Sequence, residues 1–156
     1  MAITFEGHFD VASPRADVYA FLADPRQFAP CLPTFHALEV RDERTAEVTV
    51  RVGVGKIRGN AAVLLSLRAD EPPVRAAYEG KGRIMGSAFT MATTFDLAAG
   101  EQGGTRVNWR GELSLFGALV GLAGGLIRPV ARKDIERMVA SLQAALGGTM
   151  AGVVGA

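Results

Sequence analysis

The chain is poor in cysteine and histidine, and this excludes several kinds of site. Cys31 is the only thiol among 156 residues, so the protein has neither an internal disulfide nor a metal centre built from several cysteines. Because Cys31 lies in a rigid loop between Pro30 and Pro33, we interpret it as a buried structural thiol. His8 and His36, the only histidines, lack metal-ligand spacing and a nucleophile nearby in the sequence. We therefore expect no metal and no cofactor, and we assign no catalytic residue.

The chain also lacks an excess of charge of either sign. It has 17 basic and 16 acidic residues, which gives a formal net charge of +1. It has no basic tract with interleaved aromatic residues, so we expect no nucleic-acid partner. The uncharged stretch of residues 113–127 is about 15 residues long and contains glycines, whereas a membrane span needs about 20 apolar residues. Met1 leads directly into a strand pattern instead of a signal peptide, so we expect a cytoplasmic protein.

The pattern of apolar and polar residues predicts a single domain over residues 1–148, with a flexible tail over residues 149–156. Alternation of apolar and polar side chains, which is typical of half-buried strands, occurs in seven segments. These segments are residues 3–11, 35–41, 46–52, 57–67, 76–83, 88–97 and 106–115. Because the last six follow one another with short turns, we expect an antiparallel meander.

Two short helices are predicted between the first strand and the second. Ser13 and Asp24 are N-cap residues, and each is followed directly by a proline that suits the first helical position. Pro30 and Pro33 then end the second helix. The first part of the domain is therefore a strand followed by two short helices.

The last predicted element is a long amphipathic helix that begins near Leu119 and ends before Gly147 and Gly148. Apolar residues recur along it at intervals of three and four. The opposite side, which we expect to face water, carries Arg128, Arg132, Lys133, Asp134, Glu136 and Arg137. Pro129 stands inside this pattern, so we expect a kink near it or a loose first half of the helix.

A curved sheet that wraps a single helix leaves a space between them, and this space is the natural place for a ligand. On the last two strands one alternating set of side chains is apolar, and we expect that set to face the helix. The candidate ligand-binding residues are Phe89, Met91, Phe95 and Trp109 on the strands and Leu122, Leu126 and Met138 on the helix. The alternative is that these side chains fill the core and leave no pocket.

Glycines recur every fourth residue near the start of this helix, at Gly117, Gly121 and Gly125. A glycine inside a helix costs about 1 kcal/mol relative to alanine, so this spacing needs a reason. The glycines either let the helix lie close on the sheet or make this segment a movable lid. Our candidates for the cavity entrance are these three glycines together with Cys31, Leu32 and Pro33 in the facing loop.

A set of short motifs gives the chain a family resemblance from about residue 2 to residue 146. The motifs are Asp24-Pro25, Cys31-Leu32-Pro33, Val52-Gly53 with Lys56-Ile57-Arg58-Gly59, Gly80-Lys81-Gly82, Gly104-Thr105-Arg106-Val107 with Trp109, and Gly117-Ala118-Leu119 leading to Leu126-Ile127. In their order and spacing they resemble the CoxG family of carbon monoxide dehydrogenase subunits, which is part of the START-like (SRPBCC) helix-grip superfamily.

This resemblance implies an α+β helix-grip fold, in which a seven-stranded antiparallel curved sheet wraps a long C-terminal helix around an apolar ligand cavity. It also implies an accessory subunit of a molybdenum hydroxylase of the carbon monoxide dehydrogenase type, one that helps to tether the enzyme at the membrane and handles quinone. Thr34-Phe35 replaces the Gly-Cys that usually follows the family's Cys-x-Pro, and longer members continue into an apolar anchor. For a chain that stops at Ala156 we therefore expect, at most, a peripheral contact with the inner face of the membrane through residues 119–127.

Two functions from different classes remain open. In the first, the protein is a binding module for an apolar small molecule such as a quinone or lipid, and it docks on an oxidoreductase. In the second, it is an enzyme of the polyketide cyclase/dehydratase kind, which needs Asp96, Glu112 or His8 to point into the pocket. Strand register distinguishes the two functions, because a shift of one residue exchanges the inner and outer faces of the sheet. The alternation of apolar and polar residues favours the first function. A docking role without any ligand is a third alternative.

Overall fold

The sheet of this protein consists of seven antiparallel strands in the order β1-β7-β6-β5-β4-β3-β2. The structure, a computed structural model, describes residues 2–32, 34–54, 57–123 and 125–147. The strands are β1 (Ala2–Val11), β2 (Phe35–Val40), β3 (Thr45–Val54), β4 (Ile57–Glu71), β5 (Arg75–Ile84), β6 (Ser87–Ala99) and β7 (Thr105–Leu115). Strands β2 to β7 form the predicted meander, and β1 closes it by pairing with β7.

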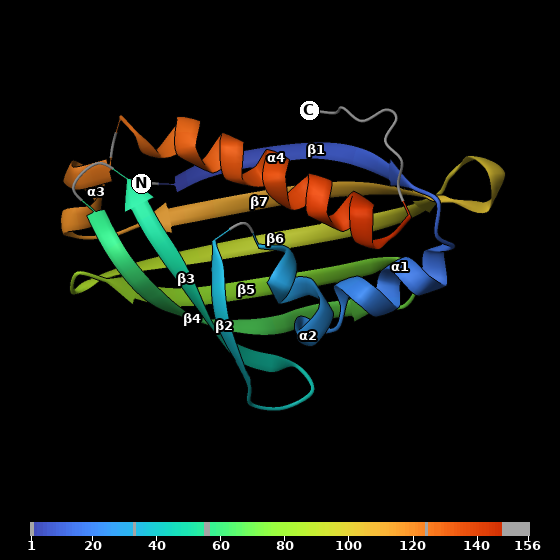
Figure 1. The fold of residues 1–156 in the computed structure, drawn as a ribbon, viewed down its shortest axis with the longest axis horizontal. Coiled ribbons are helices and arrows are strands. Elements are labelled where there is room, and N and C mark those ends of the chain that lie inside the picture. Colours follow the sequence, from blue (N-terminus) through green and yellow to red (C-terminus); the bar gives the residue numbers. More distant parts are fainter. Residues whose placement is uncertain (1, 33, 55–56, 124, 148–156) are drawn as a thin grey trace.

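The helices lie on one side of this sheet. They are α1 (Arg15–Leu22), α2 (Pro25–Phe28), α3 (Ala118–Ala123) and α4 (Ile127–Ala145), with short 3-10 turns η1 (Ala29–Cys31) and η2 (Glu101–Gly103). Figure 1 shows α1, α2 and α4 on the near side of the sheet, where β2 and β3 run obliquely to the other strands as the sheet curls. This is the expected helix-grip arrangement, and the predicted fold class is confirmed.

Strand register decides which side chains face the helices. On β6 and β7 the partners include Phe89 with Leu115, Met91 with Leu113 and Phe95 with Trp109. Because side chains alternate along a strand, these residues share one face. Phe95 and Leu115 are buried on that face, so it is the inner face that the helices cover. The prediction that the apolar set faces the helix is confirmed.

The core has two separate parts on this inner face. A large cluster of buried side chains lies under α1, α2 and the second half of α4, and includes Phe9, Leu22, Phe28, Phe95 and Leu142. A small cluster consists of Ala61, Ile84, Leu115 and Leu119, with Val130 packed against it. The end of the sheet near α3 is therefore held by far fewer buried contacts than the end near α1.

The start of α1 and the end of α4 are tied together through Ser13. Its backbone N–H and its hydroxyl both donate to the carbonyl of Leu146, at 3.3 and 2.6 Å. The prediction that Ser13 caps the first helix is therefore wrong, because Pro14 occupies the cap position and the Ser13 side chain serves α4 instead. Asp24 does cap α2, and its carboxylate accepts from the N–H of Arg26 at 2.9 Å.

The long C-terminal helix is broken a few residues before Pro129, so the expected interruption near this proline is confirmed, although the proline itself lies inside the second helix. Helix α3 ends at Ala123 and α4 begins at Ile127, so the break lies in the glycine-containing segment between them. Pro129 stands in the first turn of α4, where a backbone N–H has no partner within the helix and its loss is tolerated. The helix ends at Ala145, and Gly147, which follows the C-cap residue Leu146, has a φ of 76° that suits a C-terminal glycine, as expected.

We predict that Thr105→Val destabilises the fold, whereas Thr94→Val does not. Thr105 is 1% exposed and donates from Oγ1 to the carbonyl of Ser13 at 2.8 Å, so valine leaves that carbonyl without this partner. The loss should lower the free energy of unfolding by about 1–2 kcal/mol. Thr94 lies on the outer face opposite Arg110, where the same change should stay within about 0.5 kcal/mol. Urea unfolding followed by circular dichroism measures both values, and equal effects at the two sites would contradict this role of Thr105.

Candidate functional site

Between the two core clusters lies a group of inner-face side chains that is only partly covered. We call this group the middle band: it comprises Phe5 on β1, Phe89 and Met91 on β6, and Trp109 and Leu113 on β7. Register places all five on the inner face. All five are nevertheless of intermediate exposure, whereas Phe9 and Phe95 nearby are buried. The helices therefore leave part of the apolar surface accessible between the two clusters.

Three large side chains of this band lie over glycines on the neighbouring strand. Trp109 pairs with Gly7, and a β-carbon on Gly7 would stand 2.8 Å from its Cζ2 atom. Met91 and Phe89 pair with Gly80 and Gly82, where a β-carbon would stand 2.6 Å from each side chain. Because the glycines have no side chain, the tryptophan, methionine and phenylalanine lie along the sheet instead of standing up toward the helix. These pairs bring large side chains of the middle band down onto the backbone of the neighbouring strand.

One further inner-face glycine, Gly111 on β7, is not covered in this way. It pairs with Phe5 on one side and Thr93 on the other. The nearest atoms to a β-carbon at this position, the carbonyl oxygen of Ala92 and Oγ1 of Thr93, are 4.0 Å away. A β-carbon at Gly111 would therefore have room, and a larger side chain there would project from the face of the sheet that the helices cover.

The structure brings some of the predicted ligand-binding residues together. Phe89, Met91 and Trp109 belong to the middle band, and Met138 on α4 packs against the large cluster beside them. Phe95 is 0% exposed and makes an edge contact with the Phe28 ring, so it belongs to the core. Leu126, at the N-cap of α4, is 50% exposed. The side chain of Leu122 lies outside the described residues.

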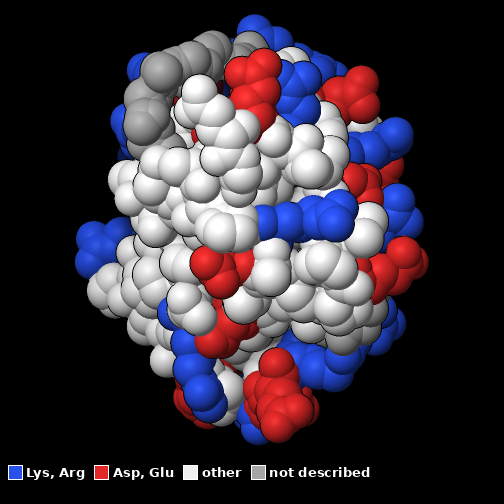
Figure 2. Space-filling view, turned by 90° about the vertical axis from the view of Figure 1, so that its right-hand side faces the viewer, with Lys and Arg blue, Asp and Glu red and all other residues white. Residues whose placement is uncertain are grey.

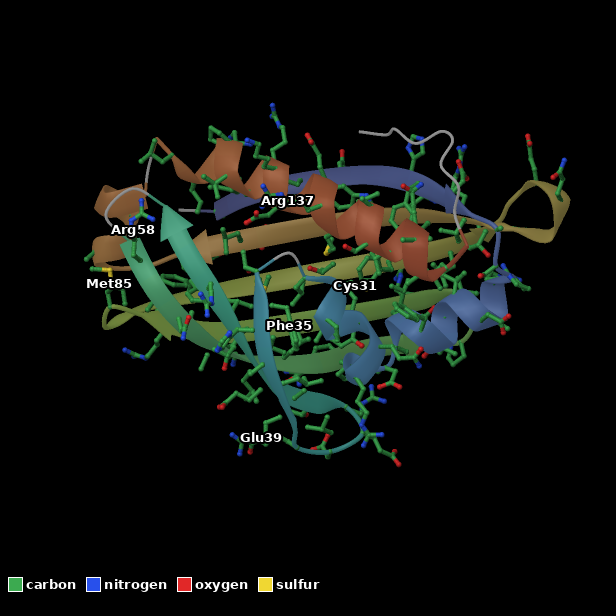
Figure 3. All side chains as sticks on the ribbon, viewed as in Figure 1. Cys31, Phe35, Glu39, Arg58, Met85 and Arg137 are labelled. Carbon is green, nitrogen blue, oxygen red and sulfur yellow. The ribbon has the colours of Figure 1, made fainter. Side chains whose placement is uncertain are left out.

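Cys31 and Leu32 of the predicted entrance lie where η1 leads into β2, and Pro33 lies outside the described residues. Figure 3 shows Cys31 and Phe35 on the helix-covered side of the sheet at this point. The Cys31 thiol is buried and its Sγ lies 3.8 Å from the carbonyl of Gln27, and desolvation raises its pKa. These are the properties of a structural thiol, as expected.

The glycines of the predicted entrance do not serve close packing on the sheet. A β-carbon at Gly121 or Gly125 would meet no atom within 4 Å among the described residues. Gly117 has a φ of 61°, in the region that favours glycine, so it serves the turn from β7 into α3. Of the two interpretations of these glycines, the close-packing one does not fit this arrangement.

The acid and base candidates of the cyclase hypothesis all lie on the outer face. Asp96 and His8 both pair with Asn108, and Glu112 pairs with Ala92, on the side opposite Trp109. The Asp96 carboxylate lies 2.6 Å from Nε of Arg75, which raises the pKa of that guanidinium. None of the three reaches the inner face, so they cannot act on a molecule bound there.

The exposure of Asp134 differs from what the helical pattern predicts. We expected it on the water-facing side, but the half-buried positions of α4 include Val130, Asp134 and Met138, which are spaced by four. Burial raises the pKa of the Asp134 carboxyl, and the nearby positive charge of Arg137 only partly opposes this shift. The spacing from Val130 and Met138 was the signal that could have placed Asp134 on the inner side.

A second surface feature lies at the end of the molecule that carries α3. Four large apolar side chains are exposed there, and we call them the apolar tip: Met85 (58%), Phe116 (49%), Val120 (38%) and Leu126 (50%). The start of β6 and the segment that leads from β7 into α3 are in contact, since the N–H of Phe116 donates to the carbonyl of Ala88. Arg58 lies at the same end as Met85 in Figure 3, and Arg128 stacks on the Phe5 ring at 5.6 Å.

The end of the molecule opposite the apolar tip has a different surface. Figure 2 shows the end opposite the apolar tip, where basic and acidic side chains are interspersed and neither sign forms a continuous patch. A shallow depression of about 490 Å³ lies away from the inner face, between the β2–β3 turn and β4, and is lined by charges of both signs. Within the described ranges, no helix is long and apolar enough to cross a membrane, and no three potential ligands are placed to hold a metal.

Comparison with known proteins gives one family match and several structural likenesses. The sequence model of the CoxG family, whose description is that of a carbon monoxide dehydrogenase subunit, matches residues 7–147. Among curated proteins, none matches this sequence. A conserved protein from Geobacillus kaustophilus superposes with a TM-score of 0.79 at 15% identity, over 92% of this chain and 95% of that one.

Two further structures connect this fold with other proteins. Ara h 8.0201 superposes with a TM-score of 0.65 at 16% identity, over 94% of this chain and 98% of its own. The di-domain ARO/CYC protein BexL from the BE-7585A biosynthetic pathway gives a TM-score of 0.63 at 16% identity, over 96% of this chain and 51% of BexL. At such low identity these likenesses show the helix-grip fold and nothing more.

We predict that Gly7→Ala disturbs the middle band, whereas Gly111→Ala leaves it intact. The new β-carbon at Gly7 would collide with the indole of Trp109, the only tryptophan, while the one at Gly111 has room. Gly7→Ala should shift the tryptophan emission maximum and lower the free energy of unfolding by about 1–3 kcal/mol. Gly111→Ala should leave the emission unchanged. Fluorescence spectra and urea titrations check both, and an unshifted Gly7→Ala spectrum would refute the close contact.

Proposed function

The chain belongs to the CoxG family of carbon monoxide dehydrogenase subunits, and from this premise we propose that it binds an apolar small molecule, a quinone or lipid-like compound, between α4 and the inner face of the sheet. In this proposal it is an accessory protein of a carbon monoxide dehydrogenase-type molybdenum hydroxylase and performs no chemistry itself. The family name supports this partnership. The proposed binding site is the middle band.

The observation that carries the proposal is the partial exposure of apolar side chains that face inward. Phe5, Met91, Trp109 and their neighbours lie on the face that should be the core, yet the helices leave them incompletely covered. Covering apolar surface contributes about 25 cal/mol per Å², so a ligand that covers about 100 Å² here gains about 2.5 kcal/mol. The glycines beneath Trp109, Met91 and Phe89 provide the room for it.

The cyclase-like alternative is weaker, because its three candidate groups lie on the outer face. The likeness to BexL concerns the fold alone at 16% identity. An enzyme that uses this site would have to rely on Asp134, because the inner-face positions of β1, β5, β6 and β7 hold no carboxylate, histidine, lysine or arginine, and the phenol of Tyr78 on β5 is buried and donates to the carbonyl of Leu22. General acid–base chemistry on a polyketide needs groups within hydrogen-bond reach of the substrate. A binding role therefore fits the site better.

We propose further that the apolar tip is a peripheral contact with a membrane, from which the ligand is loaded. The tip has four exposed large apolar side chains, as a surface that inserts into the headgroup region requires. Arg58, Arg83 and Arg128 are exposed basic residues near it, and such residues favour anionic lipid. Leu126 of the tip also lies within residues 119–127, the surface expected from the sequence to contact the membrane.

We predict that the protein binds menadione, and that Gly111→Leu weakens this binding at least tenfold. The leucine side chain would occupy the space above the middle band, whereas the control Ala92→Leu adds the same side chain on the outer face of the adjacent strand. Quenching of Trp109 fluorescence reports binding, and native mass spectrometry of the purified protein shows whether an apolar molecule is already bound. If the wild type does not bind menadione or other quinones and lipids, and carries no co-purified molecule, the proposed function is wrong.

We predict that the combined change Phe116→Ser and Leu126→Ser lowers co-sedimentation with vesicles several-fold. The vesicles contain phosphatidylcholine with phosphatidylglycerol, so they offer both apolar and anionic contacts. The control is Leu64→Ser, since Leu64 is 43% exposed but lies on the outer face opposite Lys81. Circular dichroism confirms that each variant is folded. Equal loss in the control, or no sedimentation of the wild type, would refute the membrane contact.

A further inference from the structure

Asp134 is set apart by the apolar character of its surroundings. The inner-face positions of β1, β5, β6 and β7 hold no aspartate, glutamate, lysine, arginine or histidine. The same is true of the described inner-face positions of β3, which are Ala46, Val48, Val50 and Val52. A half-buried carboxyl group on the helix therefore faces a sheet surface without any opposite charge.

The contacts of α4 show which way Asp134 points. Arg128 lies over Phe5, and Gln143 donates to the carbonyl of Asp10 at 3.2 Å, so this side of the helix faces β1. At 3.6 residues per turn, Asp134 lies about 120° around the helix from Arg128 and about 180° from Gln143. Asp134 therefore faces away from β1, toward the side of α4 that lies over the rest of the sheet.

The neighbours of Asp134 along the helix place it between the two core clusters. Val130, one turn before it, packs against the small cluster together with Val50 and Val52. Met138, one turn after it, packs against the large cluster. Asp134 lies within about 40° of both around the helix axis, so it stands at the level of the partly covered surface between the clusters.

The Asp134 carboxylate has no hydrogen bond or ion pair with any of the residues that the structure describes. Arg137, labelled in Figure 3, is exposed and exerts only a weak opposing effect on the carboxyl pKa that burial raises. Since no described side-chain oxygen is both buried and unpartnered, the Asp134 carboxylate oxygens remain accessible, and they are free to accept a hydrogen bond from a donor group of a ligand.

We propose that Asp134 is the polar anchor of the ligand site and accepts a hydrogen bond from a donor group, such as a hydroxyl, at one end of an otherwise apolar molecule. This inference rests on the proposed function and makes it more specific. A quinol has hydroxyl groups that donate to a carboxylate, whereas the carbonyl groups of a quinone do not. Among quinone-type ligands the site therefore prefers the reduced form.

The test compares naphthol with methoxynaphthalene, in which a methyl group replaces the donated hydrogen, by isothermal titration calorimetry at neutral pH. Hydrogen bonds to charged groups are stronger than those between neutral groups, so the wild type should bind naphthol about tenfold more tightly or better. Asp134→Leu should bind both probes equally. Glu136→Leu, an equivalent change at an exposed position two residues away on the same helix, should keep the wild-type preference.

Two further readouts keep the outcomes distinct. Asp134→Leu should unfold at the same or higher urea concentration than the wild type, because it removes an unpaired, partly buried charge. Asp134→Asn keeps the size of the side chain, and it should reduce the preference for naphthol without abolishing binding. Equal binding of both probes by the wild type overturns the anchor and leaves the proposed function standing. Binding of neither probe overturns both.

Discussion

The pairing of inward-facing glycines with large side chains on the next strand is the constraint on which the rest of this structure depends. Trp109 over Gly7, Met91 over Gly80 and Phe89 over Gly82 are cross-strand partners, so each pair requires the register of its two strands. A slip of one residue would move all of these side chains to the outer face. The same pairs keep bulky groups close to the sheet. These pairs therefore fix both the strand register and the position of the bulky side chains of the middle band.

Much of the fold could be predicted from local patterns, because those patterns report burial on one side of an element. Alternation on β6 and β7 identified the inner face, and Asp24-Pro25 identified the start of α2. Ser13 shows the limit of local signals. Its sequence context is that of a helix cap, but a partner 133 residues away, the carbonyl of Leu146, takes its hydroxyl. Long-range partners of this kind leave no trace in the neighbouring sequence.

The candidate site could be predicted only in part, and Asp134 shows why. A helical pattern assigns charged residues to water, which is correct for the exposed Arg132, Lys133 and Glu136. It fails for Asp134, because a charged residue there occupies a half-buried position at which the pattern expects an apolar residue. Phe95 shows the opposite error. The pattern placed it correctly on the inner face, but it lies under α2 and is part of the core. Its partner on β7, Trp109, is on the same face and remains partly exposed.

The uneven division of the core also indicates where the site can open. Of the described residues, seventeen form the large buried cluster beside α1 and α2, and four form the small cluster beside α3. Because local opening is easiest where few apolar contacts are lost, the α3 end is the less costly end to displace. Helix α3 is a separate helix from α4, whose later turns carry Asp134 and Met138. The apolar tip is at this same end, so a ligand that arrives through the tip would meet the part of the fold that opens most readily, while the large cluster keeps the register of the middle band.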